Sequence, residues 1–320
     1  MRAIDVFNGD ADGLCALHQL RLAQPLASDL VTGVKRDIQL LDRVQAGAGD
    51  CVTVLDISLD SNRQGLTRLL DAGARVEYFD HHHAGEIPSS PRLRAHIDLA
   101  PTVCTSILVD RHLGGQHRLW AITAAFGDNL EQSARALAAQ TELTDAQLAL
   151  LARLGECLNY NGYGDGLEDL HFHPAQLYTQ VKPYANPLAF IAESSAFGRL
   201  EAGLLEDKAL AKQVKPCDAG PRCAAYLLPD APWARRVSGV FANGLASGHP
   251  DRAHAVLTVN SHGDFTVSVR APVSDPQGAD TLCLKFPTGG GRKGAGGVNR
   301  LPAAQLDTFL AGFRAQFSRV

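Results

Sequence analysis

Short apolar runs that end in acidic residues or histidines recur through the first half of the chain. Residues 2–7 run into Asn8-Gly9-Asp10-Ala11-Asp12-Gly13, residues 51–55 into Asp56, residues 74–79 into Asp80-His81-His82-His83, and residues 121–126 into Gly127-Asp128-Asn129. Between the runs, apolar residues recur at helical spacing, as at Leu14, Leu17 and Leu20. This alternation is typical of βαβ units. The pattern therefore predicts four strands in a parallel sheet.

The rest of the chain predicts further elements. Helices are expected over residues 62–73, 102–113 and 144–159, a short strand over 95–99, and broken helices over 174–215. A turn-rich boundary at 216–235 precedes a hairpin of residues 253–259 and 264–269, a helix at 278–286, a glycine-rich loop at 288–297 and a helix at 301–317. We therefore expect an α/β protein with a parallel-sheet domain (1–155), a helical linker (156–234) and a smaller α/β domain (235–320).

The polar residues at the strand ends are candidate metal ligands. In a parallel sheet the carboxyl ends of the strands share one edge, so residues far apart in sequence converge there: Asp10, Asp12, Asp56, Asp80, His81, His82 and Asp128. Clustered carboxylates repel one another unless cations neutralise them. Two divalent ions about 3.5–4 Å apart would do so, and would hold the attacking and leaving oxygens of a phosphoryl centre. Residues 80–83 alone are also compatible with a solvated polar turn.

These segments, in this order, resemble the four motifs of the DHH phosphoesterase superfamily: residues 8–13, Asp56, Asp80-His81-His82 and Gly127-Asp128-Asn129. The superfamily includes RecJ-like single-strand exonucleases, exonucleases and phosphatases of short oligonucleotides and phosphoadenosine phosphate, cyclic-dinucleotide phosphodiesterases and family II inorganic pyrophosphatases. Residues 267–270 and 290–297 are similar to its substrate-binding DHHA1 domain. The resemblance frames most of the chain and leaves residues 155–235 uncovered.

The resemblance implies roles for individual residues. Two divalent ions, Mn²⁺ in the first place and Mg²⁺ as the alternative, would be bound by Asn8, Asp10, Asp12, Asp56, Asp80, His81 and Asp128. A hydroxide bridging these ions would be the nucleophile, and His82 would bind the phosphate or protonate the leaving group. The catalytic residues implied are Asp56, His81, His82 and Asp128. Substrate would be bound in a cleft between the domains by His82, Arg270, Gly290, Gly291, Arg292 and Lys293.

Two positions depart from the family pattern. Asn8 stands where many relatives have an aspartate, and its amide oxygen can bind a metal but brings no charge. Arg292 stands where relatives usually carry a histidine. A guanidinium grips phosphate through a fork of donors but cannot act as a neutral imidazole. Phosphate binding should therefore survive the change, whereas a role for a neutral imidazole should not.

Charge and cysteine content restrict the partners and the compartment. The net charge of −4 argues against a protein that coats long nucleic acid, although residues 235–320 carry ten basic and five acidic residues. The seven cysteines form no CxxC pair, which indicates free thiols in a reducing cytoplasm. We find no secretory signal and no apolar stretch long enough to span a bilayer, so no membrane partner is expected.

Three hypotheses follow. The first is a metal-dependent phosphoesterase of phosphodiester or phosphomonoester bonds in short oligonucleotides or nucleotides, acting as a monomer or a homodimer. The second is a RecJ-like exonuclease on longer single-stranded nucleic acid, although the negative charge and the aromatic content of 6% favour short substrates. The third is a non-catalytic nucleotide-binding relative, which Asn8 keeps open.

Overall fold

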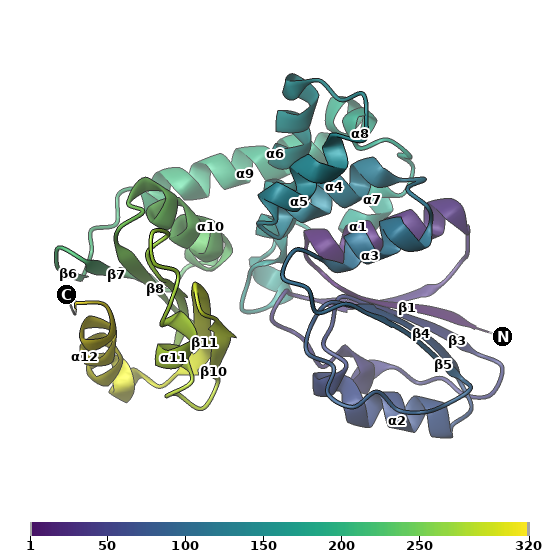
Figure 1. Ribbon diagram of the computed structural model, residues 1–320, viewed down its shortest axis with the longest axis horizontal. Coiled ribbons are helices and arrows are strands. Elements are labelled where there is room, and N and C mark those ends of the chain that lie inside the picture. Colours follow the sequence, from purple (N-terminus) through teal and green to yellow (C-terminus); the bar gives the residue numbers. More distant parts are fainter. Residues whose placement is uncertain (1, 319–320) are drawn as a thin grey trace. The chain divides into compact units, whose positions relative to one another are not determined.

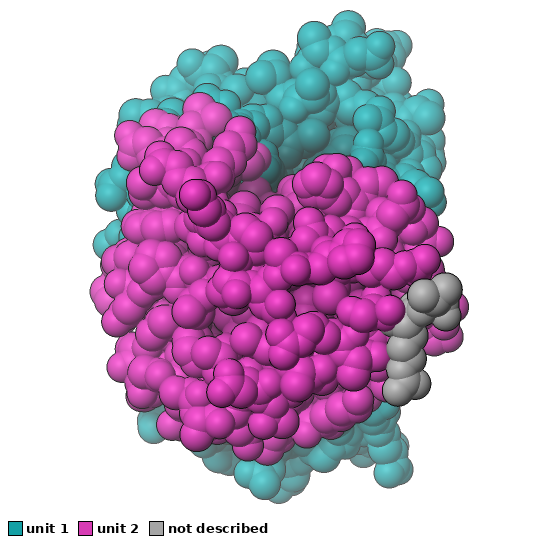
Figure 2. Space-filling view, turned by 90° about the vertical axis from the view of Figure 1, so that its left-hand side faces the viewer, with its two compact units in different colours: residues 1–162, 170–201 teal, residues 163–169, 202–320 magenta. Residues whose placement is uncertain are grey.

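The computed structural model describes residues 2–318, and the chain forms two compact units (Figures 1 and 2). Unit 1 comprises residues 1–162 and 170–201, and unit 2 comprises residues 163–169 and 202–320. The three domains expected from the sequence stay a prediction. Within the described residues, no helix combines the length and the apolar character needed to cross a membrane.

Unit 1 is built around a parallel sheet with strand order β2-β1-β3-β4-β5. The strands are β1 (Ala3–Asn8), β2 (Asp29–Gly33), β3 (Cys51–Leu55), β4 (Arg75–Asp80) and β5 (Leu93–Ile97). The runs predicted at 2–7, 51–55, 74–79 and 95–99 are therefore strands, and β2 is an addition. The chain passes from β1 to β2 on one side and returns to β3 on the other. Sheets of this kind bind ligands at the carboxyl ends of the strands where the order reverses.

Helices cover both faces of this sheet (Figure 1). One face carries α1 (Ala11–Ala23) and α3 (Thr105–His112), and the other carries α2 (Arg63–Asp71) with the 3-10 turns Leu40–Arg43 and Asp60–Asn62. Successive side chains of β1 point to opposite faces of the sheet, which explains how this strand contacts helices on both faces. Ile4 and Val6 belong to the core that includes Leu66 of α2. Asp5, with the opposite parity, accepts a hydrogen bond from Arg21 of α1 (2.8 Å).

The remaining helices of unit 1 follow the sheet in sequence. They are α4 (Arg118–Gly127), α5 (Glu131–Ala138), α6 (Asp145–Gly162), α7 (Pro174–Val181) and α8 (Pro187–Glu193), and α9 (Ser195–Ala211) contains the boundary with unit 2. Tight contacts join α4 to α6, because a Cβ added to Gly155 of α6 would lie 2.2 Å from the carbonyl oxygen of Thr123.

The predicted strand at residues 121–126 is wrong, because this run is the interior of helix α4. Ala121, Ala124 and Ala125 favour a helix, since alanine has the highest helix propensity. Residues 121–125 are all buried, so the run shows neither helical nor strand periodicity and reads as uniformly apolar. Asp128 therefore caps the C-terminal end of a helix and does not follow a strand.

Unit 2 contains a mixed sheet with strand order β10-β11-β9-β8-β7-β6. Its strands are β6 (Asp218–Ala219), β7 (Cys223–Leu228), β8 (Ala253–Val259), β9 (Phe265–Arg270), β10 (Gly289–Arg292) and β11 (Ala295–Leu301). Helix α10 (Pro232–Gly248) links the parallel strands β7 and β8 and packs on one face. The core on the other face includes residues of α11 (Ala279–Cys283) and α12 (Leu306–Phe317), which follows the 3-10 turn Ala303–Gln305. The predicted hairpin is present as β8 and β9.

Two segments of unit 2 differ from the prediction. The turn-rich stretch 216–235 contains strand β7, whose flanking residues Pro221 and Pro229 supplied the turn signal. The glycine-rich segment 288–297 is largely the hairpin of β10 and β11. Its glycines are needed for packing: a Cβ on Gly289 would lie 1.7 Å from the Cys283 carbonyl oxygen, and Gly291 has a φ of +136°.

Candidate metal centre

The first polar residues of the centre lie where β1 passes into α1. Asp10 caps α1, and its Oδ1 accepts hydrogen bonds from the backbone N–H groups of Asp12 and Gly13 (3.0 and 3.1 Å). Asp12 reaches α3, where its two oxygens accept from the N–H groups of Thr105 and Ser106, both at 2.7 Å. Both carboxylates are buried. Backbone donors therefore hold these two acidic groups in fixed positions.

Strands β3 and β4 bring a second group of residues to the same edge. Asp56 follows β3 with a φ of +59°, and its Oδ1 accepts a hydrogen bond from the Thr105 hydroxyl (3.2 Å). The Nε2 of His81 lies 3.4 Å from Asp56 Oδ1 and 3.8 Å from Asp12 Oδ2. One ligand atom from each of Asp56, His81 and His82 lies within 4.8 Å of the other two. This spacing is suitable for a single cation.

Asp80, at the end of β4, is fully buried and contacts His82. Its Oδ1 lies 2.7 Å from His82 Nδ1, whereas that nitrogen lies 3.9 Å from Asp56 Oδ1. The His82 side chain is 45% exposed. Asp80 therefore orients His82, in the way that a carboxylate fixes a functional imidazole.

Asp128 and Lys35 complete the cluster, and sequence reasoning missed the lysine. Lys35 lies two residues beyond β2, and its Nζ donates to the Asp10 carboxylate and to Asn159 Oδ1 (3.0 Å). The same nitrogen lies 3.6 Å from Asp128 Oδ1. Only a prediction of β2 could have placed Lys35 at this sheet edge, and that strand has only two apolar residues, Leu30 and Val31, which gave no such signal.

Burial and mutual repulsion govern the protonation of the carboxylates. Burial, followed by the charges of Asp12 and Asp10, raises the pKa of Asp56 well above its usual value. Burial also raises the pKa of Asp128, although Lys35 opposes the shift. For Asp10, burial acts in the same direction but Lys35 outweighs it, so the pKa is lowered. The group as a whole therefore has an excess of buried negative charge.

Two buried oxygens at the centre have no hydrogen-bond partner among the described residues: Asn8 Oδ1 and Asp80 Oδ2. The Asn8 amide is oriented by its Nδ2, which donates to the Lys35 carbonyl oxygen (3.2 Å). A buried acceptor without a partner costs about 1–3 kcal/mol, which a bound cation would offset. Carboxylate, imidazole and amide ligands together suit a divalent ion such as Mn²⁺ or Mg²⁺. The residues present thus fit a metal.

The predicted substrate-binding residues of the C-terminal region belong to unit 2. Arg270 ends β9, where its Nε donates to Asn243 Oδ1 (2.8 Å) and its Nη1 donates to the Val269 carbonyl oxygen (3.1 Å). Burial and the nearby Arg292 lower the pKa of Arg270, and no carboxylate of the described chain forms an ion pair with it. Gly290, Gly291 and Arg292 form part of β10, and Lys293 lies in the turn that follows. A Cβ on Gly290 would meet open space.

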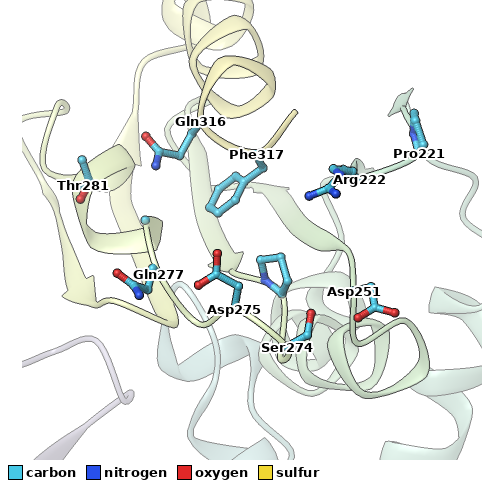
Figure 3. Close-up of a pocket in the computed structure, with 11 residues that line it drawn as sticks. Pro221, Arg222, Asp251, Ser274, Asp275, Gln277, Thr281, Gln316 and Phe317 are labelled. Carbon is cyan, nitrogen blue, oxygen red and sulfur yellow. The ribbon is translucent and has the colours of Figure 1, made fainter. Parts of the chain in front are cut away.

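Unit 2 also contains a cavity of about 560 Å³ (Figure 3). Its lining includes Arg222, Asp251, Asp275, Gln277 and Gln316. None of the predicted substrate-binding residues is part of this lining. The cavity is therefore not the predicted substrate-binding site.

Comparison with solved structures supplies the fold family, although no protein-family model and no curated protein matches the sequence. An exonuclease RecJ bound to manganese is 20% identical, with a TM-score of 0.59 and coverage of 100% of this chain and 90% of RecJ. The Mn²⁺ complex of RecJ from Thermus thermophilus is 19% identical (TM-score 0.66), and this chain is covered fully but spans only 52% of that protein. PggH, a pGpG-specific phosphodiesterase from Vibrio cholerae, is 15% identical (TM-score 0.55), with coverage of 99% and 100%. The chain therefore has a DHH-like fold.

Proposed function

We propose that the chain is a divalent-metal-dependent phosphoesterase that hydrolyses phosphodiester or phosphomonoester bonds in short oligonucleotides or nucleotides. The observation that carries this proposal is the gathering of Asp10, Asp12, Asp56, His81 and Asp128 at one edge of the parallel sheet. The fold adds support, because the similar structures include two manganese-bound RecJ exonucleases and a phosphodiesterase of pGpG.

The carboxylates and His81 are the proposed metal ligands. His81 Nε2 lies 3.8 Å from Asp12 Oδ2 and 3.4 Å from Asp56 Oδ1, and the partnerless oxygens of Asn8 and Asp80 are further ligand candidates. When bound, a divalent ion supplies positive charge that polarises a phosphoryl oxygen and activates water. The protein's own contribution is to hold these ligands rigid, since Asp12 is fixed by two backbone N–H groups of α3.

His82 is the proposed proton donor to the leaving oxygen. Burial acts to lower its pKa, but the hydrogen bond with Asp80 and the charges of Asp80, Asp128 and Asp12 outweigh it, so the pKa is raised. A raised pKa favours the imidazolium, which can donate a proton. Because Nδ1 is engaged by Asp80, Nε2 is the nitrogen left for the substrate. The 45% exposure of the side chain makes it accessible.

Arg270 and Arg292 are proposed to bind a phosphate that is not cleaved. Arg270 carries a guanidinium without an acidic partner, and Arg292 is exposed on the edge strand β10. Forked donors of this kind suit phosphate oxygens.

A second candidate function, exonuclease action on longer single strands, is favoured by the two RecJ structures. The net charge of −4 favours the short substrate.

Hydrolysis of a small substrate panel tests the proposal. The panel contains dinucleotides, a cyclic dinucleotide, 3′-phosphoadenosine 5′-phosphate and a single-stranded 20-mer, each with Mn²⁺, Mg²⁺ or a chelator. We expect cleavage of a short substrate that requires metal and is lost in His81→Ala but retained in His262→Ala, which alters an exposed turn. Preference for the 20-mer would favour the exonuclease. Binding of nucleotides without cleavage would support the non-catalytic alternative instead.

A further inference from the structure

We propose that Lys35 takes the place of one of the two divalent ions expected from the DHH resemblance, so that the centre binds a single ion at Asp12, Asp56 and His81. This inference rests on the proposed function, because it concerns the same site. It concerns a residue that no motif in the sequence marks.

The cluster divides into two halves with different contents. In one half, the Lys35 ammonium contacts Asp10, Asn159 and Asp128, the last at 3.6 Å. The other half contains Asp12, Asp56, Asp80, His81 and His82. No lysine or arginine of the described chain lies within 4.0 Å of the carboxylates in this second half. A fixed cation therefore contacts the carboxylates of one half, whereas histidines are the basic side chains that contact the carboxylates of the other half, where Lys35 acts on Asp56 only through its charge.

The surroundings of Lys35 resemble those of a bound cation. An ammonium group has three N–H donors, and three oxygen-bearing groups surround this one: two carboxylates and one amide. The side chain is 24% exposed, and the Asp10 carboxylate that it contacts is 3% exposed. A buried carboxylate already neutralised in this way has little need of a metal.

The backbone of Lys35 is also held from two directions. Its N–H donates to the carbonyl oxygen of Gly162 (2.8 Å), and its carbonyl oxygen accepts from Asn8 Nδ2 (3.2 Å). Gly162 in turn lies against Asp10, because a Cβ added there would come within 2.9 Å of the Asp10 Cβ. The packing of α1 and α6 therefore fixes the backbone of Lys35, which is not a mobile surface lysine.

Asn8 provides an independent argument from charge. The resemblance predicts an aspartate at this position, and the change to asparagine removes one negative charge. Exchanging a divalent ion for an ammonium removes one positive charge. The two changes cancel, so the site keeps the charge that an aspartate with a second ion would give it. The Asn8 amide also contacts the Lys35 backbone directly. The asparagine and the lysine therefore lie next to each other in the centre.

A lysine in this position would act differently from a metal. The ammonium can hold a phosphoryl oxygen electrostatically as charge develops, and it does so at any metal concentration. It does not lower the pKa of a bound water as a divalent ion does. We therefore expect metal activation with a single binding event, assigned to the half that contains Asp12, Asp56 and His81.

Metal stoichiometry tests the inference without reference to activity. We would titrate purified protein with Mn²⁺, count bound ions by calorimetry and elemental analysis, and record electron paramagnetic resonance spectra. The wild type should bind one Mn²⁺ with the spectrum of an isolated ion. Lys35→Ala should bind two, with the spectrum of a coupled pair, because it vacates the space between Asp10 and Asp128. Lys182→Ala, at an exposed position, is the matched control and should bind one.

Two outcomes would overturn the inference: two ions in the wild type, or one ion in both the wild type and Lys35→Ala. If the alanine variant fails to fold, Lys35→Gln replaces it, because glutamine keeps a donor and most of the length without the charge. A one-to-two change in stoichiometry with no cleavage of any substrate would refute the proposed function and leave the Lys35 inference standing. Cleavage by a wild type with two bound ions would do the reverse.

Discussion

Asp56 combines two unfavourable features in one residue. Its φ of +59° lies in the left-handed region, which costs a residue other than glycine about 1 kcal/mol or more. Its carboxylate is buried beside Asp10 and Asp12, which raises its pKa. Strain and a displaced pKa at one residue are more common at functional positions than elsewhere. Asp56 is therefore the residue whose replacement best separates stability from activity.

We predict that Asp56→Asn stabilises the metal-free protein and abolishes turnover. Asparagine tolerates the left-handed region and removes the buried charge, so the gain at pH 8 should be on the order of 1–3 kcal/mol. A pKa raised by folding means that the folded state binds more protons above pH 3.8 than the unfolded state. The free energy of unfolding of the wild type should therefore fall as the pH rises through that window.

Urea unfolding in a chelator at pH 5 and pH 8 would measure this effect. The variant should lose less stability between the two pH values than the wild type does. Asp71→Asn, at an exposed position, should behave like the wild type. Equal pH dependence in the wild type and Asp56→Asn would show that folding does not raise the pKa of Asp56.

Among the elements, the close packing of α4 on α1 and α6 positions Asp128. A Cβ on Gly127 would lie 2.5 Å from the Ala11 Cβ and 2.9 Å from the Gly155 carbonyl oxygen. Asp128 is the next residue, so the approach of these helices sets its distance from Lys35 and Asp10. Glycine at this position therefore sets the place of Asp128 as well as the packing of the helices.

Gly127→Ala should thus lower stability and, by moving Asp128 away from Lys35, reduce turnover. Overpacking of this kind typically costs about 1–3 kcal/mol, and any shift of α4 displaces Asp128. Gly198→Ala is the matched control, because its added Cβ would meet no atom within 4 Å in helix α9. That control should stabilise the protein by about 0.5–1 kcal/mol. Thermal unfolding and turnover of the best panel substrate by both variants give the comparison, and unchanged turnover in Gly127→Ala would refute the link.

The success of sequence reasoning depended on the kind of element. Strands β1, β3 and β4 were predictable because each apolar run ends abruptly at acidic residues, and these ends placed Asp10, Asp56 and Asp80 at one edge. Asp128 was placed at that edge through a strand that is in fact helix α4. Lys35 and Asn159 could not be brought together from the sequence, because β2 was not predicted and the helix predicted over 144–159 does not by itself show what its end contacts.

For the whole molecule, the distribution of charge differs between the two units. The candidate ligands belong to unit 1, whereas Arg270, Arg292 and the basic segment 235–320 belong to unit 2. Arg270→Ala should therefore raise KM by about tenfold or more with a smaller loss in kcat, as expected when a bond present in both ground and transition states is removed. Steady-state kinetics on the best panel substrate would measure the split, with Arg222→Ala as an exposed control. A loss confined to kcat would contradict a binding role.

The hydrogen bond between Lys35 and Asn159 has a consequence for biosynthesis. The two residues are 124 positions apart, and Asp12 and Thr105 are 93 apart. Contacts between distant positions form slowly, because long loops must close first. A chain emerging from the ribosome therefore exposes Asp10, Asp12 and Asp56 well before Asn159 has been made. We expect the half of the centre that contains Lys35 to stay incomplete until α6 docks, so the ammonium reaches its final position only after residue 159 has been made.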